Sequence, residues 1–374
     1  MKGRGATFNP ANRFRVEARE RHDDGWQPGS DCDDPLPPLR TVVTIQRART
    51  IIAHNDSPDV PFSQSINPYQ GCEHGCIYCY ARPSHAYLDL SPGIDFETRL
   101  FAKPDAAALL RAELAKPGYR CDPIALGTNT DPYQPIERDW KVTRSVLEVL
   151  AEHEHPFTIV TKSALVERDI DIIAPMAARQ MARVYLSITT LDGELARRME
   201  PRATAPHRRL QALKTLAAAG IPVGVMVAPL IPQLNDRDLE AILEAAAANG
   251  AQAAGWVLIR LPREVAPLFR DWLDAHYPQR AAHVMSLIRQ MRGGRDYDAE
   301  FGARMRGGGE FAALLEKRFG IACRRLGLNR GREHTGLDTT RFRLPVHANN
   351  ARQRSLFDGA ARRTLELRVH AHRV

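Results

Sequence analysis

The chain of 374 residues has little of what marks membrane or secreted proteins. No apolar stretch approaches the roughly 20 residues that a membrane-spanning helix needs, so we expect no membrane partner. The N-terminus begins Met1-Lys2-Gly3-Arg4 and continues with charge, without the apolar core of a signal peptide. There are only six cysteines, and we expect a cytoplasmic protein whose thiols stay reduced. Clustered cysteines in such a protein indicate metal binding or catalysis rather than disulfides.

Lysine is scarce relative to arginine. The chain has seven lysines and 45 arginines, with a formal net charge of +8 and a pI near 9.3. A basic balance favours a polyanionic partner such as nucleic acid. An arginine bias is also typical of a GC-rich genome, so charge alone supports nucleic-acid binding only weakly. The sequence lacks a Walker A loop and a Rossmann glycine fingerprint, which disfavours nucleoside-triphosphate and nicotinamide enzymes.

Short apolar runs alternate with helical patterns through the middle of the chain, after a strand-like alternation at Thr41–Ile52. We predict strands at Gln64–Asn67, Pro123–Gly127, Phe157–Thr161, Arg183–Thr189, Pro222–Val227 and Gly255–Arg260. Helices are predicted at Pro104–Lys116, Asp139–His153, Glu167–Arg179, Ala205–Ala219 and Asp236–Asn249. Six such units predict a parallel α/β sheet, either an open six-strand partial barrel or a full barrel missing two units, with a doubly wound sheet as the runner-up. In a parallel barrel the chemistry lies at the C-terminal ends of the strands.

Four segments are expected along the chain. Residues 1–40 read as an irregular N-terminal arm, which we expect to be solvated unless it packs against the barrel mouth. Residues 41–262 form the predicted barrel core, and residues 263–328 a helical C-terminal extension. Residues 329–374 read as a basic polar tail.

Three cysteines lie within the ten-residue stretch Gly71-Cys72-Glu73-His74-Gly75-Cys76-Ile77-Tyr78-Cys79-Tyr80. Their thiolates can converge on one centre only if the backbone loops around it, and Gly71 and Gly75 allow that. Three cysteines on a four-iron cluster leave one iron open to a small-molecule chelate. The spacing favours an iron–sulfur site over two alternatives, a zinc site completed by His74 or His85 and three unrelated buried thiols.

The C-x3-C-x2-C spacing, with an aromatic residue before the last cysteine, resembles the signature of the radical S-adenosylmethionine (SAM) superfamily. The resemblance covers residues 60–262 and implies a partial (β/α)6 TIM-type barrel with a helical C-terminal extension and irregular tails. It implies that Cys72, Cys76 and Cys79 hold one [4Fe-4S] cluster and that SAM binds the open iron. An electron, from a reductant such as flavodoxin or ferredoxin, would then cleave SAM to a 5′-deoxyadenosyl radical that abstracts hydrogen from the substrate.

Four segments at predicted strand ends resemble the spore photoproduct lyases and their DNA-photolyase-like relatives. These segments are Gly127–Pro135, Val160–Ser163, Ser187–Thr190 and Met199–Arg202. The residues that the resemblance implies for SAM binding are Tyr78, Gly127, Thr128, Asn129, Thr130, Lys162, Ser187 and Arg202. Lys162 would pair with the SAM carboxylate, although a surface lysine is the alternative. Asp131 and Glu200 would line the cavity.

Cys121 resembles the hydrogen donor of the spore photoproduct lyases, because it lies six residues ahead of Gly127. A lone cysteine is more often a small core residue. In the polar tail, Gln353-Arg354-Ser355-Leu356-Phe357 resembles a peptide that binds the bacterial sliding clamp, with docking on the chain's own barrel as the alternative.

The sequence therefore predicts a radical SAM enzyme. The first hypothesis for its substrate is nucleic acid, in a lyase reaction that repairs a lesion. A second keeps the radical chemistry with a peptide, a tRNA or a metabolite, since a fold does not determine a substrate. A third, from another class, is a zinc-stabilised nucleic-acid-binding protein without catalysis.

Overall fold

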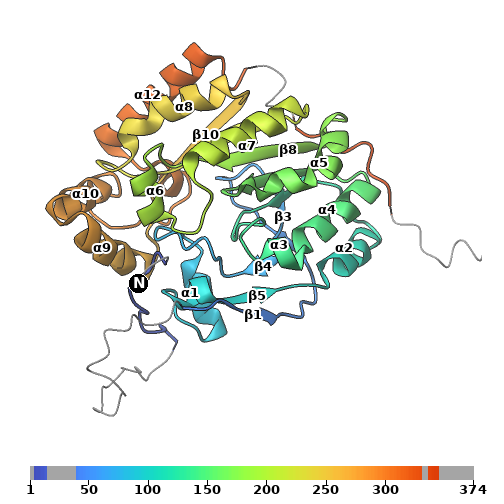
Figure 1. Cartoon of the computed structure of the whole chain (residues 1–374), viewed down its shortest axis with the longest axis horizontal. Coiled ribbons are helices and arrows are strands. Elements are labelled where there is room, and N and C mark those ends of the chain that lie inside the picture. Colours follow the sequence, from blue (N-terminus) through green and yellow to red (C-terminus); the bar gives the residue numbers. More distant parts are fainter. Residues whose placement is uncertain (1–3, 15–38, 331–335, 345–374) are drawn as a thin grey trace, which may run out of the picture.

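An open, mostly parallel sheet forms the centre of the protein (Figure 1). The computed structural model describes residues 4–14, 39–330 and 336–344. The seven strands of the sheet lie in the order β10-β9-β8-β7-β6-β3-β2. Their bounds are β2 (Ile52–His54), β3 (Gln64–Ile66), β6 (Ile124–Leu126), β7 (Phe157–Thr161), β8 (Ala182–Ser187), β9 (Val223–Leu230) and β10 (Ala253–Leu258). β2 pairs antiparallel with β3, and the other six strands run parallel.

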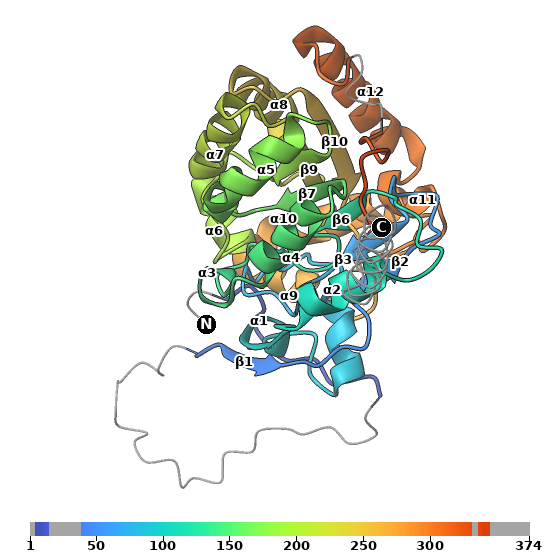
Figure 2. The same cartoon turned by 90° about the vertical axis from the view of Figure 1, so that its right-hand side faces the viewer.

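Helices follow the strands and lie along the outside of the sheet (Figures 1 and 2). They are α2 (Ala106–Leu114), α3 (Glu137–Trp140), α4 (Val142–Glu152), α5 (Ile170–Ala177), α6 (Gly193–Met199), α7 (Pro206–Ala218) and α8 (Leu239–Ala248). Short 3₁₀ helices precede α5 and α8, namely η2 (Ala164–Asp169) and η3 (Asp236–Asp238). Within the described residues no pairing joins β10 to β2. The open six-strand partial barrel is confirmed, and the doubly wound sheet is not.

One predicted helix is interrupted. The pattern over Asp139–His153 predicted a single helix, but α3 and α4 are separated at Lys141, whose φ is 52°. The carboxylate of Glu137 accepts hydrogen bonds from the backbone N–H groups of Thr143 (2.9 Å) and Arg144 (3.3 Å). These bonds satisfy the first N–H groups of α4, so a new helix begins where the sequence pattern looked continuous.

A second sheet was not predicted. Its three strands, in the order β1-β5-β4, are β1 (Val42–Ile45), β5 (Arg99–Ala102) and β4 (Tyr69–Gln70). The alternation over Thr41–Ile52 is therefore divided, because β1 joins this sheet and β2 joins the main one. The predicted strand Gln64–Asn67 would place the cysteine stretch directly after the first barrel strand. Instead β4, a strand of the small sheet, lies between β3 and the cysteines.

The helical extension lies beside the open end of the sheet. Its helices are α9 (Val265–His276), α10 (Pro278–Gln290), α11 (Ala303–Arg306) and α12 (Gly309–Leu326). α12 packs along α8, and α9 packs on α10 (Figure 1). No helix in the described ranges is both long and apolar enough to cross a membrane.

The described segments nearest the two chain ends both pack on the protein, residues 4–14 in the way that the sequence allowed as the alternative to a solvated arm. Residues 4–14 are not a solvated arm, since Ala6 and Asn12 are 1% and 8% exposed against the cysteine region. Residues 336–344 pack where the strands begin, and the Phe342 ring lies 5.2 Å from the ring of His155. The peptide Gln353–Phe357 lies outside the described residues.

His155 should make stability depend on pH. Its side chain is fully buried, and burial lowers its pKa from 6.5 to about 4. The unfolded chain therefore takes up the proton first, so this contribution is present above about pH 6.5 and is lost as pH falls towards 4. Urea denaturation should show the native protein losing up to about 3 kcal/mol more than His155→Gln across that range. Parallel pH curves for the two proteins would contradict this.

Candidate cofactor site at the cysteine loop

The three clustered cysteines occupy a loop, residues 71–80, between β4 and the 3₁₀ helix η1 (Arg82–Leu88). Cys72 and Cys76 are buried, Cys79 is half-buried, and all three are free thiols. Gly71 and Gly75 have φ values of 76° and 68°, so the loop turns at both glycines as predicted. The Cys79 N–H donates to the Cys76 carbonyl at 3.2 Å, which tightens the turn around the thiols.

Cys72 and Cys76 lie in surroundings that disfavour a thiolate without a bound metal. Burial raises the pKa of Cys72 well above its usual range, and Asp131, Cys76 and Cys79 raise it further. Burial also raises the pKa of Cys76 to about 12, although the Lys162 ammonium opposes the rise. Thiols bound to a metal centre are deprotonated by its positive charge. Three mutually interacting thiols, two of them buried and one half-buried, therefore suit a cationic centre, and soft thiolates suit iron–sulfur clusters.

The two histidines proposed as a fourth zinc ligand have other partners. His74 Nδ1 lies 3.4 Å from Asp131 Oδ2, and His85 Nε2 lies 2.9 Å from the Arg99 carbonyl oxygen. Among the described residues, no group of three or more His, Cys, Asp or Glu side chains is close enough to hold a single metal ion. The thiolates of a four-iron cluster bind different irons, so they stand further apart than ligands of one ion.

Asp131 joins the loop to the ends of β6 and β7. Its carboxylate accepts hydrogen bonds from the Thr161 hydroxyl (2.7 Å), the Lys162 N–H (2.7 Å) and the Tyr133 N–H (2.9 Å). Burial alone would raise its pKa, but His74 and these hydrogen bonds lower the pKa to about 2. Asp131 is therefore ionised, and both of its carboxylate oxygens already accept hydrogen bonds from the protein.

Glycine at position 127 and serine at 187 have structural reasons to be there. A Cβ added to Gly127, where φ is 89°, would lie 2.0 Å from the Val160 carbonyl oxygen. Ser187 ends β8, and its carbonyl accepts a hydrogen bond from Arg209 at 2.8 Å. Gly127 thus allows the ends of β6 and β7 to lie close together, and Ser187 joins β8 to Arg209 on α7. A direct contact of either residue with SAM stays a prediction.

The other predicted residues after β6 are anchored through their backbone. The Asn129 and Thr130 N–H groups donate to the Asn67 side-chain oxygen at 3.1 and 3.4 Å. The Thr128 carbonyl accepts a hydrogen bond from the Tyr80 hydroxyl. This segment is therefore fixed against the cysteine loop before any ligand arrives.

Lys162 presents an available cation beside the loop. Among the described residues its ammonium has no hydrogen-bond or ion-pair partner, and it lies 5.9 Å from the centre of the Tyr78 ring. Burial lowers the pKa of Lys162, but Cys76 and Glu200 outweigh burial and leave the pKa raised. A lysine that stays charged and unpaired here can receive an anionic group.

Glu200 and Arg209 form a buried ion pair under the site, and the sequence did not reveal Arg209. They are 2% and 1% exposed. The Glu200 carboxylate also accepts hydrogen bonds from the Thr189 hydroxyl at 2.8 Å and from the Tyr78 hydroxyl. Burial would raise the pKa of Glu200, but Arg209 and Lys162 lower it. Tyr78 is thus anchored by its hydroxyl, so it can offer a ligand only its ring.

Arg202 is engaged with the cysteine loop itself. Its guanidinium lies 2.8 Å from Glu73 Oε1, and its backbone N–H donates to the His74 carbonyl at 3.2 Å. The side chain is 40% exposed. This contact ties the loop to the segment after α6, and a role of Arg202 in SAM binding stays a prediction.

Cys121 is not brought to this site. It lies just before β6, whereas the cysteine loop faces the segment that follows β6. Burial and Asp122 raise the pKa of its thiol to about 12. The remaining described cysteine, Cys323, lies in α12. A hydrogen donor at Cys121 would have to act from the wrong end of the strand.

An arginine and a tyrosine missed by sequence reasoning flank the loop. Arg260 follows β10, and its guanidinium lies 4.5 Å above the Tyr80 ring. Tyr80 follows Cys79 directly and is 42% exposed. Next to them, the Arg304 guanidinium lies 4.6 Å above the exposed Phe301 ring. No periodicity signals the Arg260–Tyr80 pair, because it joins segments distant in sequence, whereas Arg304 and Phe301 are only three residues apart.

Comparison with known proteins gives concordant matches. The family model described as Radical SAM superfamily matches residues 66–246. An uncharacterized protein of Mycobacterium tuberculosis strain H37Rv is 38% identical over 233 residues, covering 62% of this chain and 68% of that protein. An uncharacterized protein of Methanocaldococcus jannaschii is 29% identical and covers 57% and 76%. The structure of spore photoproduct lyase complexed with dinucleoside spore photoproduct aligns with a TM-score of 0.56 and 17% identity, over 76% of this chain and 80% of that one. That last likeness is one of fold.

Removing the charge of Glu200 should be costly. Glu200→Gln leaves the buried Arg209 guanidinium without a counter-charge, so the free energy of unfolding should fall by about 3–5 kcal/mol in urea denaturation of the apo-protein. Glu194→Gln is the matched control, because its pair with Arg198 is exposed and its loss should cost less than about 1 kcal/mol. Equal losses in the two variants would show that the buried pair does not hold the site.

Proposed function

Since the chain belongs to the radical SAM superfamily, we propose that Cys72, Cys76 and Cys79 hold its [4Fe-4S] cluster and that Lys162 binds the SAM carboxylate. The superfamily works with this cluster and SAM, so the chain is a radical SAM enzyme. When bound, the two cofactors supply reductive cleavage of SAM and a radical that abstracts hydrogen. The observation that carries the assignment is the group of three buried or half-buried free thiols beside one charged, unpaired lysine.

The chain's own residues prepare this region for a charged cofactor. Asp131 and the Glu200–Arg209 pair are already satisfied within the protein, so they hold the loop without competing for the ligand. Cys76 and Tyr78 belong to an apolar cluster with Met199, which limits water around the thiols. In such a region an ammonium–carboxylate contact is worth more than in water. Lys162 is thus suited to select the anionic end of SAM.

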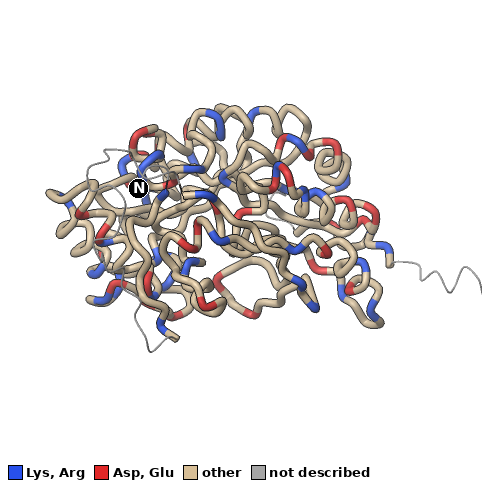
Figure 3. The backbone as a smooth tube through the Cα atoms, turned by 60° about the horizontal axis from the view of Figure 1, so that its bottom comes forward, with Lys and Arg blue, Asp and Glu red and all other residues tan. Residues whose placement is uncertain are grey.

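We propose nucleic acid as the substrate class, in a lyase-type reaction. The support is the pairing of Arg260 with the exposed Tyr80 ring, together with the exposed Phe301 ring. The Arg304 guanidinium above Phe301 is already paired with Asp59, so Arg260 is the cation that carries this proposal. Rings that stack on bases and guanidinium groups that bind phosphates are typical of single-strand binding. Figure 3 shows acidic and basic positions interspersed, so the net charge itself adds little. The similar fold of a lyase complexed with a dinucleoside photoproduct is further support.

Anaerobic reconstitution with iron and sulfide, followed by dithionite and SAM, tests the chemistry. The native protein should form 5′-deoxyadenosine, and Cys76→Ala should lose both bound iron and this product. Lys162→Met should keep its iron but bind SAM about tenfold more weakly, because one charge-assisted contact is lost. Lys214→Met, an exposed lysine on α7, is the control. A native protein that holds the cluster but never cleaves SAM would overturn the assignment.

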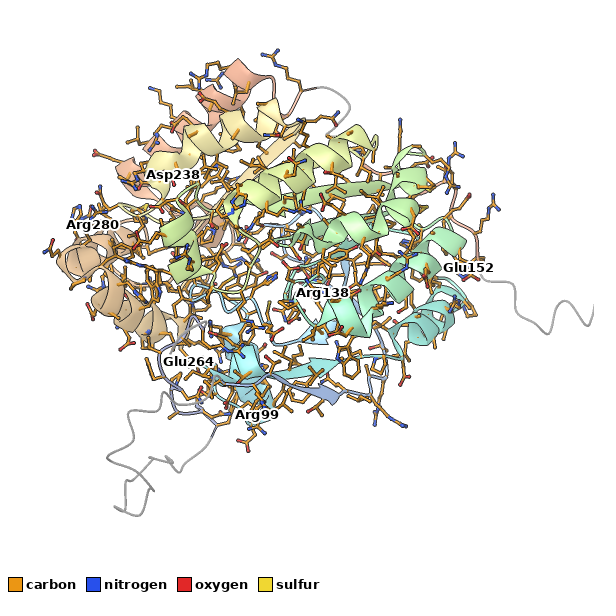
Figure 4. The ribbon with its side chains drawn as sticks, viewed as in Figure 1. Arg99, Arg138, Glu152, Asp238, Glu264 and Arg280 are labelled. Atoms are coloured by element: carbon orange, nitrogen blue, oxygen red, sulfur yellow. The ribbon has the colours of Figure 1, made fainter. Side chains whose placement is uncertain are left out.

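Fluorescence anisotropy with a single-stranded DNA oligonucleotide tests the substrate class. Arg260→Ala should weaken binding about 5- to 150-fold, since one stacking or cation contact contributes about 1–3 kcal/mol. Arg111→Ala is the matched control, an exposed arginine on α2 whose partner Glu152 is labelled in Figure 4. Equal effects of the two substitutions would instead favour a peptide or metabolite substrate.

Two partners stay predictions. The sliding-clamp peptide Gln353–Phe357 lies outside the described residues, and a titration of that peptide against the clamp would test it. A flavodoxin or ferredoxin remains the expected electron donor.

A further inference from the structure

Residues 4–14, here called the N-terminal strap, lie against the cysteine loop. Ala6 is 1% exposed and belongs to the same apolar cluster as Cys76 and Ile77. The buried Asn12 side chain donates hydrogen bonds to the carbonyls of Ala86 (2.9 Å) and Leu90 (3.3 Å). The strap therefore contacts both the loop and the segment that follows it.

The strap is bound through one buried carboxylate. The Gly5 and Ala6 N–H groups donate to the two oxygens of Glu97 at 2.9 and 2.8 Å. Glu97 is also paired with Arg82 at 2.5 Å, and both side chains are 0% exposed. Glu97 thus has three donors, two of which the strap provides.

Arg82 carries this connection to the cysteines. Its Nε donates to the Cys76 carbonyl at 2.9 Å, and its Nη2 donates to the Gly75 carbonyl at 3.2 Å. The strap therefore contacts Glu97, Glu97 pairs with Arg82, and Arg82 binds the backbone between two of the three cysteines. Any shift of the strap reaches the loop through buried, charge-assisted hydrogen bonds.

Close packing explains two glycines along the strap. A Cβ at Gly5 would lie 1.8 Å from the Gly75 carbonyl oxygen, and one at Gly93 would lie 2.1 Å from the Phe8 carbonyl oxygen. The opposing atoms are backbone in both cases, so neither contact can be relieved by turning a side chain. At its far end the strap is tied to the start of α9, because Arg13 pairs at 2.8 Å with Glu264, the residue just before the helix. Glu264 is labelled in Figure 4.

We propose that the N-terminal strap is a positioning element for the cysteine loop, which holds the three thiols in their cluster-binding arrangement and shields the cluster from water. The proposal rests on the cluster site proposed above. Groups that orient metal ligands commonly change metal affinity about 10- to 100-fold when they are removed. Displacing the strap should therefore loosen the cluster even though every cysteine remains.

Gly5→Ala and Gly93→Ala displace the strap at two separate points. Gly308→Ala is the matched control, because φ there is −135° and a Cβ would meet nothing within 4 Å. In the anaerobic holoenzyme, release of iron to a ferrous chelator should be about tenfold faster in both strap variants and unchanged in the control. In the apo-protein, alkylation of Cys72, Cys76 and Cys79, followed by mass spectrometry, should be faster in the strap variants.

The two measurements separate this proposal from the assigned function. If the native protein holds a cluster and the strap variants release iron at the native rate, the strap has no positioning role and the function stands. If the native protein holds no cluster, the function fails, and unchanged alkylation rates would overturn the strap as well. Should a glycine variant not fold, Arg13→Ala loosens the half-exposed end of the strap and should also accelerate release.

Discussion

Two buried arginine–carboxylate pairs hold the cysteine loop in place. Arg82 with Glu97 binds the loop's carbonyl groups, and Arg209 with Glu200 fixes the Tyr78 hydroxyl. Burying such charges costs desolvation free energy, and losing one partner is strongly destabilising. The pairs therefore add little net free energy of folding, because the desolvation cost offsets their attraction. Their geometric effect is clear, because each one connects the loop to an element that lies far from it in sequence.

The site has many charged groups, but few of them are available to a ligand. Asp131 accepts hydrogen bonds from three protein groups, and Arg202 pairs with Glu73 on the loop. Lys162 is different, because no described residue forms a hydrogen bond or an ion pair with its ammonium. Most of the conspicuous polar residues thus hold the cysteine loop and the strand ends together, and few side chains are left to bind a ligand.

The six parallel strands and the three cysteines could be predicted, because the signal for each lies within a short stretch of the sequence. Runs such as Phe157–Thr161 consist of aromatic and β-branched residues, which favour strands, and the cysteine spacing lies within one short stretch. The small sheet could not be predicted, since β4 has two residues and β1 is largely exposed. The break at Lys141 was not predicted, because it depends on the Glu137 carboxylate, which accepts hydrogen bonds from backbone N–H groups at the start of α4. Such contacts leave no periodic pattern in the sequence. Arg209, Arg260 and Glu97 were missed for the same reason.

The described ends of the chain lie at different faces of the barrel. Position 4 is beside the cysteine loop, whereas residues 336–344 cover the ends where strands begin. An affinity tag or fusion partner joined ahead of the strap would crowd the cofactor region. The same addition joined after residue 344 would start on the face away from the thiols. Of these two attachment points, the one after residue 344 is therefore better suited to immobilising or labelling this enzyme without obstructing the barrel mouth.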